Sequence, residues 1–168
     1  MKVFFGFSLL SFLVASTMFG CGNSSTGPTA PTTADLIGKW VISSRHAAET
    51  GLIHFGNGIP DSTYHSDSVK TFSNGNDYII LNTDQTYTAS SDEKLFNANS
   101  DAGTWSLAGN QLRLISHTAN DTIDLSTSVS GTNGTFVQTI SQVVDLSTLF
   151  PGVTVTLTGS ITYSGTKQ

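Results

Sequence analysis

The sequence predicts an all-β protein folded as an antiparallel up-and-down β-barrel of about 8–9 strands. Charged residues make up only 11% of the 168-residue chain, against roughly 25% in an average soluble domain. Ser, Thr, Asn and Gly take their place, a composition that favours strands and turns over helices. Hydrophobic residues at 38% are sufficient for a buried core, so the chain is not expected to be disordered.

Alternation of apolar and hydroxyl side chains is clearest between Val153 and Ser164. Successive side chains of a strand point to opposite faces, so this segment predicts a long strand with one buried and one wet face. Gly159 lies on the apolar side, where a strand that curves around a barrel would bend.

Shorter alternating segments flank turn sequences and predict hairpins. Gly103–Leu107 and Gln111–His117 enclose Ala108-Gly109-Asn110, and Tyr78–Leu81 is followed by Gln85–Ser90. Further strands are expected at Lys39–His46, Thr63–Phe72, Asp121–Val129 and Thr135–Val144. These strands could form a sandwich or a closed barrel. Closure is favoured because the chain has few charged residues to protect exposed strand edges.

The amino terminus has the features of an export signal spanning residues 1–20. Lys2 precedes an apolar run from Val3 to Ala15. A transmembrane helix needs about 20 apolar residues, and this run is shorter. Cys21 is the only cysteine, so no intramolecular disulfide can form.

Met18-Phe19-Gly20-Cys21 resembles the lipobox of bacterial lipoproteins. The resemblance implies that Cys21 is acylated, for example with palmitate, and becomes the first residue of a protein anchored in the cell envelope by its N-terminal lipid. Gly22 stands where the inner-membrane retention signal has Asp, which implies the outer membrane if the organism is Gram-negative. The alternative is a free thiol beside an ordinary cleavage site, or an uncleaved anchor.

Residues 21–34 are expected to form a flexible tether, because they carry no charge and no large apolar side chain. A spacer of about 13 such residues has a root-mean-square span of roughly 20 Å. The barrel domain is then expected over residues 35–168.

Three stretches resemble bacterial lipocalin-like domains. Leu36–Trp40 is similar to the opening Gly-x-Trp strand of lipocalins, and Leu81–Thr88 to the Phe-x-x-Asp-Gly-Thr-Tyr hairpin. Gly103–Leu112 is similar to the Gly-x-Trp-x-Leu-x-Gly-x-x-Leu hairpin. The resemblance implies a lipocalin-like barrel but not a particular ligand.

The apolar inner wall of the barrel is the candidate ligand site. An eight-stranded barrel is either filled by its own side chains or holds one small ligand, and both alternatives stay open. Two apolar connections, Ala47–Ser62 and Asp145–Gly152, are expected to cover the ends as lid or plug, the second as one helical turn. The residues expected to point into the barrel are Tyr87, Trp105, Leu107, Leu112, Phe136, Val155 and Leu157.

Catalysis, cofactors and metal binding find no support in the sequence. Motifs for nucleophilic catalysis, zinc-dependent hydrolysis and nucleotide binding are absent. The protein is therefore not expected to be an enzyme or to carry a cofactor. The candidate metal ligands lack metal-site spacing, and solvated loop positions are expected for them. They are His46, His54, His65, His117, Asp61 and Asp67.

The expected partners follow from these features. Because the net charge is −5 and the basic residues are scattered, nucleic acid is not expected as a partner. The leading hypothesis is a non-catalytic envelope lipoprotein that binds a small apolar or amphipathic ligand. The alternative is a structural or interaction module that binds another envelope protein or a glycan through its outer surface.

Overall fold

The structure is a computed structural model that describes residues 30–56, 58–91 and 99–168. The signal over residues 1–20 and Cys21 lie outside these residues, and so does most of the expected tether. Within the described part a short helix, α1 (Thr33–Leu36), precedes the strands. The strands are β1 (Gly38–His54), β2 (Ser62–Thr71), β3 (Tyr78–Leu81), β4 (Thr86–Ser90), β5 (Ser100–Ala108), β6 (Gln111–Ser116), β7 (Thr122–Ser130), β8 (Asn133–Asp145) and β9 (Thr154–Lys167).

The described strands form one antiparallel sheet that closes on itself. Their order is β2-β1-β3-β4-β5-β6-β7-β8-β9, and pairing of β1 with β9 completes an eight-stranded barrel with β2 as an additional strand. The prediction of an all-β, antiparallel barrel is confirmed. No helix among the described residues is long and apolar enough to cross a bilayer.

β1 changes its partner halfway along its length. Its first residues, Gly38–Val41, pair with β3, whereas residues 44–53 pair with β2. Against β9 the register shifts between Ile42 and Ser44, so Ser43 is an extra residue in β1, as in a β-bulge. The prediction that Ala47–Ser62 forms a covering loop is wrong. Beyond the bulge β1 continues to His54, with β9 on one side and β2 on the other.

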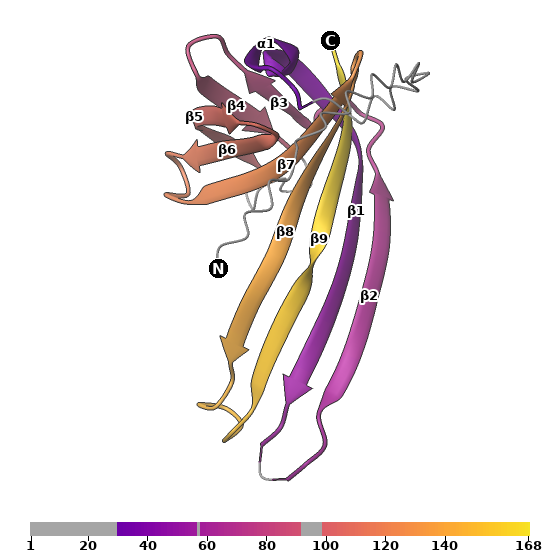
Figure 1. Ribbon diagram of the computed structural model, residues 1–168, viewed down its shortest axis with the longest axis vertical. Helices are drawn as coiled ribbons and strands as arrows, with labels where there is room; N and C mark the ends of the chain where they lie inside the picture. The colour runs from indigo at the N-terminus through magenta and orange to yellow at the C-terminus, as the bar shows by residue number, and fades with distance from the viewer. Residues whose placement is uncertain (1–29, 57, 92–98) are drawn as a thin grey trace, which may run out of the picture.

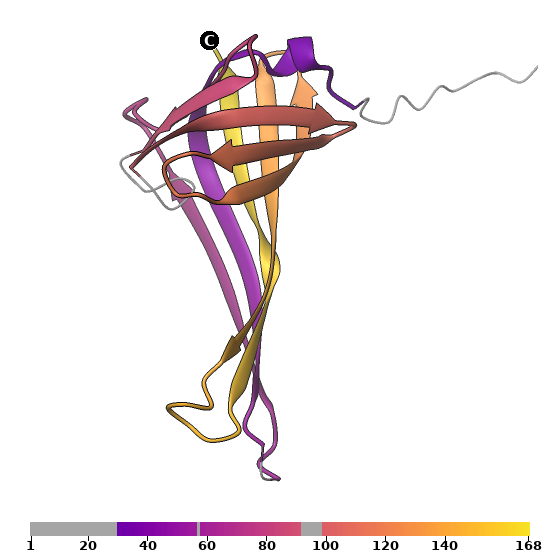
Figure 2. The ribbon, with the colours of Figure 1, turned by 90° about the vertical axis from the view of Figure 1, so that its left-hand side faces the viewer.

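Three barrel strands, β1, β8 and β9, continue past the closed barrel and form with β2 what we call the arm. β7 pairs with β8 only as far as Leu125 opposite Gln138, whereas β8 and β9 stay paired down to Asp145 opposite Thr154. The arm therefore consists of residues 44–54 of β1, β2, residues 139–145 of β8 and residues 154–162 of β9. Figures 1 and 2 show it as a narrow, twisted sheet that projects from one end of the barrel.

A tryptophan packs under α1 at the other end of the barrel. The Trp40 indole is fully buried, meets the edge of the Phe136 ring with centroids 5.4 Å apart, and donates a hydrogen bond to the Leu36 carbonyl at 2.7 Å. It also lies against Gly134, where an added Cβ would come within 2.6 Å of the ring. Lys167 holds α1 by donating to the Asp35 carbonyl at 2.9 Å.

The hairpins expected around Asn82–Asp84 and Gly109 are confirmed. Gly109 has φ +62° in its turn, as a tight connection requires. Gln85 has φ +64°, in a region that L residues other than Asn and Asp seldom adopt. The β3–β4 turn therefore carries local backbone strain.

Candidate functional site

The barrel interior is filled by side chains. Tyr87, Trp105, Leu112 and Phe136 belong to one buried cluster, and Leu107 packs against it. Trp105 is only 3% exposed and donates its Nε1 hydrogen to the Asn82 carbonyl at 3.0 Å. These five of the predicted site residues therefore lie on the inner wall, where they pack against each other.

A polar cluster lies in the same wall. Asp101 is buried and accepts hydrogen bonds from the Tyr87 hydroxyl at 2.5 Å and from the Ser116 hydroxyl at 2.6 Å. Burial alone would raise the pKa of Asp101, but the bonds from Ser116, Tyr87 and the Ala102 amide outweigh it and hold the pKa below its ordinary value. Burial, followed by the bond to Asp101, raises the pKa of Tyr87, so the phenol stays a donor.

Sequence reasoning missed this cluster. Asp101 stands two residues before Gly103 and four before Trp105, which is the spacing of one strand face. That alternation was the available signal, although an Asp beside a turn-rich segment resembles a loop residue.

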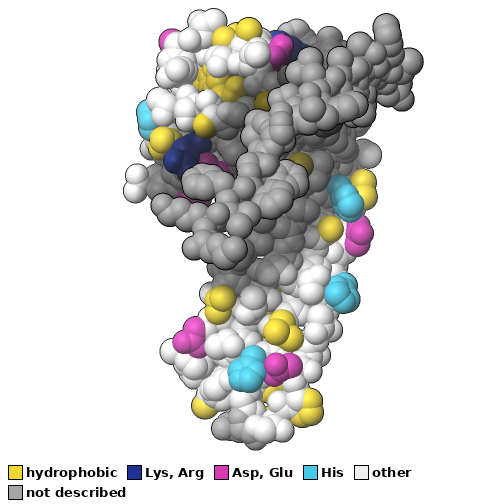
Figure 3. Space-filling view, in the orientation of Figure 1, with side chains coloured by type: hydrophobic (Ala, Val, Ile, Leu, Met, Phe, Trp, Pro, Cys, Tyr) yellow, Lys and Arg dark blue, Asp and Glu magenta, His cyan; other side chains and the backbone are white. Residues whose placement is uncertain are grey.

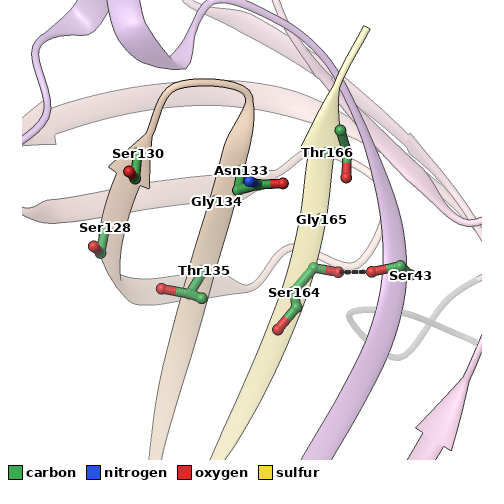
Figure 4. Close-up of a pocket in the computed structure, with 9 residues that line it drawn as sticks. All are labelled: Ser43, Ser128, Ser130, Asn133, Gly134, Thr135, Ser164, Gly165 and Thr166. Carbon is green, nitrogen blue, oxygen red and sulfur yellow. Dashed lines mark hydrogen bonds between the residues drawn. The ribbon is translucent and has the colours of Figure 1, made fainter.

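Three cavities formed by described residues all lie outside this interior. One, of about 360 Å³, lies on the outer wall across β7, β8, β9 and β1 (Figure 4). Its lining is hydroxyl-rich and uncharged, and Ser43 donates to the Ser164 carbonyl across it at 3.1 Å. The lining residues are Ser43, Ser128, Ser130, Asn133, Gly134, Thr135, Ser164, Gly165 and Thr166. Such a hollow can hydrogen-bond a polar ligand, but no aromatic ring in it offers a stacking surface.

The inner wall continues from the barrel onto one face of the arm, the inner face. Because directly paired residues share a face, the register carries the face outward from Tyr163, which is buried in the barrel and pairs with Arg45. The apolar members of the inner face are Ala47 and Ile53 on β1, Tyr64 on β2, Ile140 and Val144 on β8, and Val155, Leu157 and Ile161 on β9.

Val155 and Leu157, expected inside the barrel, lie instead on this inner face of the arm. The correction follows from the shorter β7, because the barrel is closed only down to Gln138 and both residues pair with positions farther along β8. Both side chains remain partly exposed. Beside them the Tyr64 ring covers Gly51, where an added Cβ would lie 1.8 Å from the ring.

The opposite, outer face of the arm carries histidines paired with carboxylates or hydroxyls (Figure 3). His46 contacts Asp67 at 2.9 Å and His54 contacts Asp61 at 2.7 Å. His65 hydrogen-bonds Thr50 at 3.0 Å. All three lie on strands rather than in the expected loops, whereas His117 follows β6. In the part of the chain described, no three His, Cys, Asp or Glu side chains are placed to share a metal ion.

The second expected cover, Asp145–Gly152, is a turn at the far end of the arm and does not plug the barrel. The Ser147 amide donates to the Asp145 side chain at 2.8 Å, as expected for a cap, and the Phe150 amide donates to the Leu146 carbonyl at 2.8 Å. Phe150 nevertheless points into solvent. The turn is separated from the barrel by the whole length of the arm, because β8 and β9 extend beyond the point where β7 stops pairing with β8 (Figure 1).

A closed eight-stranded antiparallel barrel that opens with a Gly-x-Trp strand is the architecture of the lipocalin-like class of β-barrels. The sequence pattern of the lipocalin-like domain matches residues 36–138, and the chain belongs to this family. The match ends at Gln138, the last residue of β8 that pairs with β7, so the distal half of β8 and all of β9 lie beyond it. No match was found among curated proteins or among solved structures.

Proposed function

We propose that the protein is a non-catalytic lipoprotein of the cell envelope that binds a small apolar or amphipathic molecule on the inner face of the arm. The observation that carries the proposal is the continuity of this partly exposed apolar face with the filled barrel interior. Membership in the lipocalin-like family supports it, since the fold is compatible with small hydrophobic ligands.

The arm suits a ligand better than the barrel does. Covering apolar surface contributes roughly 25 cal/mol per Å², and Val155 and Leu157 have exposed surface left to cover, whereas Trp105 and Tyr87 have almost none. A ligand inside the barrel would have to displace packed side chains. A ligand along the arm displaces only water.

Polar groups at the barrel end of the inner face suit an amphipathic ligand. Arg45 pairs with Tyr163 across the strands and hydrogen-bonds its side chain. Glu49 follows on the same face, beside Gly159. A ligand with its tail on Leu157 would place its head group near Arg45 and Glu49, which offer hydrogen-bond donors and acceptors respectively.

Two substitutions on one strand test the ligand site. Leu157→Asp puts a charge on the inner face, whereas the matched control Thr158→Asp puts the same charge on the exposed outer face. We expect the full chain to bind cis-parinaric acid, Leu157→Asp to weaken binding at least about tenfold, and Thr158→Asp to bind as the parent does. Fluorescence titration measures this; equal effects of both variants, or no binding by the parent, would refute the site.

The anchor is tested separately from the ligand. Acylation at Cys21 supplies hydrocarbon chains whose burial holds the protein on a membrane, about 0.8 kcal/mol per CH₂. Mass spectrometry of the N-terminal peptide should show acylated Cys21, and Cys21→Ser should move the protein from the membrane fraction to the soluble fraction. An unmodified thiol at this position would overturn the anchoring and leave the ligand proposal standing.

The alternative function, a module that binds an envelope protein or a glycan through its outer surface, is favoured by one observation. Val69 and Val143 are each 68% exposed on the outer face, at opposite edges of the arm. Val69→Asp and Val143→Asp should then abolish chemical cross-linking to a partner in intact cells without changing parinaric acid binding. Parinaric acid binding by the parent and by both variants, with cross-linking absent or unaffected by the substitutions, would favour the ligand site.

A further inference from the structure

We infer that the far end of the arm inserts into a lipid bilayer whose head groups carry no net charge. This end, which we call the arm tip, consists of the β1–β2 connection at residues 55–61, Asn57 excepted, and the β8–β9 connection at residues 146–153. The inference rests on the exposure, shape and charge of the tip, and it does not depend on the proposed ligand.

The two connections of the tip lie side by side at the far end of the arm (Figure 1). A Cβ added to Gly56 would lie only 2.9 Å from the Gly152 carbonyl oxygen, so the two turns touch. The Val153 amide donates to the Phe150 carbonyl at 3.0 Å, and the Ile59 amide donates to the Gly56 carbonyl at 3.1 Å. These bonds close each of the two turns.

Three large apolar side chains protrude from the tip. Leu149 is 71% exposed, Phe150 59% and Ile59 57%. Their exposure is unfavourable in water and is relieved by transfer into hydrocarbon. A stable protein interface buries about 800 Å² on each partner, more than a convex end of two turns readily offers. A bilayer needs no complementary shape, and insertion of the tip alone covers these groups.

The charges near the tip indicate which kind of lipid head group the bilayer carries. Asp61 lies in the tip and Asp145 directly precedes its second connection, and none of the described residues of the tip is Lys or Arg. Of the described Lys and Arg residues of the arm, Arg45 and Lys70 lie opposite each other on β1 and β2, where the arm joins the barrel. The face shown in Figure 3 likewise has no basic side chain in its lower half. Attraction to anionic head groups is therefore absent, and insertion depends on apolar contact.

A tryptophan placed at the tip tests the inference locally. The native Trp40 and Trp105 are buried, so the added indole of Phe150→Trp dominates any change that vesicles cause. With phosphatidylcholine vesicles its emission should shift to shorter wavelength, and brominated acyl chains should quench it. The matched control Ala119→Trp, in an exposed barrel turn, should show neither change, whatever holds the chain to the vesicle.

The composition of the vesicle and of the tip gives two further outcomes. Adding phosphatidylglycerol should leave the signal of Phe150→Trp unchanged or weaken it, because of the two carboxylates. Ile59→Ser and Leu149→Ser in the Phe150→Trp chain should each lower partitioning about tenfold or more. A solvent-like emission at position 150, or equal quenching at position 119, would overturn the inference. So would self-association of the parent chain that Leu149→Ser abolishes, since the tip would then bind a second copy.

Discussion

The barrel and the arm are parts of one sheet, share three strands and differ in what covers their inner face. In the barrel, inward side chains such as Trp40 and Leu112 meet the opposite wall and lose almost all exposure. In the arm, inward side chains such as Leu157 and Val144 belong to the same strands but have no opposite wall among the described strands (Figure 2). The length of β7 therefore determines whether an apolar position on β8 or β9 stabilises the fold or stays available for binding.

The largest expected difference between the two regions is in core truncation. Trp40→Ala should lower the free energy of unfolding by about 3–5 kcal/mol, because it removes the contact with Phe136 and the bond to the Leu36 carbonyl. Leu157→Ala in the arm should lower it by less than about 1.5 kcal/mol, because its side chain is already partly exposed. Urea denaturation measures both; comparable losses would mean that the arm is packed as the barrel is.

The buried carboxylate of the barrel should make its stability depend on pH. The pKa of Asp101 lies below its ordinary value in the folded protein, so the unfolded chain binds the proton more readily. The resulting stabilisation is present above the unfolded pKa and disappears as the pH falls through the folded pKa. Asp101→Asn should cost about 1–3 kcal/mol at neutral pH and flatten the stability profile below pH about 5.

Asp67→Asn is the control for this prediction, because Asp67 lies on the arm and its contact with His46 is exposed. At neutral pH we expect the free energy of unfolding of this variant to lie within about 0.5 kcal/mol of the parent's. A profile for Asp101→Asn that falls in acid as steeply as the parent's would show that other groups govern the acid limb.

One substitution in the barrel is expected to increase its stability. Gln85→Gly should raise the free energy of unfolding by about 1 kcal/mol, because glycine adopts the left-handed backbone of this turn without the side-chain penalty. The backbone bonds of Gln85 to Asn82 and Trp105 remain possible. Thermal unfolding checks this, and Thr83→Gly in the same turn serves as control. An equal gain in the control would point to general flexibility of the loop.

Much of the barrel was predictable because its signals are local. The alternation around Gly109 and from Val153 onward can be recognised from neighbouring residues alone. Both segments are strands in the structure, as predicted. The extent of β1 was not predictable in this way, because Glu49 and Gly51 interrupt the apolar pattern and the strand is held by its pairing with β9 and β2.

The candidate site shows the same division. The inward direction of Tyr87 and Trp105 follows from alternation along one strand, and the structure places both on the inner wall. The position of Leu157 beyond the barrel depends on where β7 stops pairing with β8, and no residue near Leu157 carries that information. The exposure of Leu149 and Phe150 depends likewise on the distance that the hairpin projects.

The extra residue at Ser43 sets the parity of β1 along the arm. Before it, even-numbered residues of β1 such as Ile42 point inward; after it, odd-numbered residues such as Ala47 do. If Ser43 were paired regularly opposite Ser164, the even-numbered residues would keep pointing inward along the rest of the strand. His46 and its outer-face neighbours on β1 would then lie on the side now occupied by Ala47 and Ile53. One bulged amino acid thus determines which side chains β1 presents along the open side of the protein, while the eight-stranded ring stays the same.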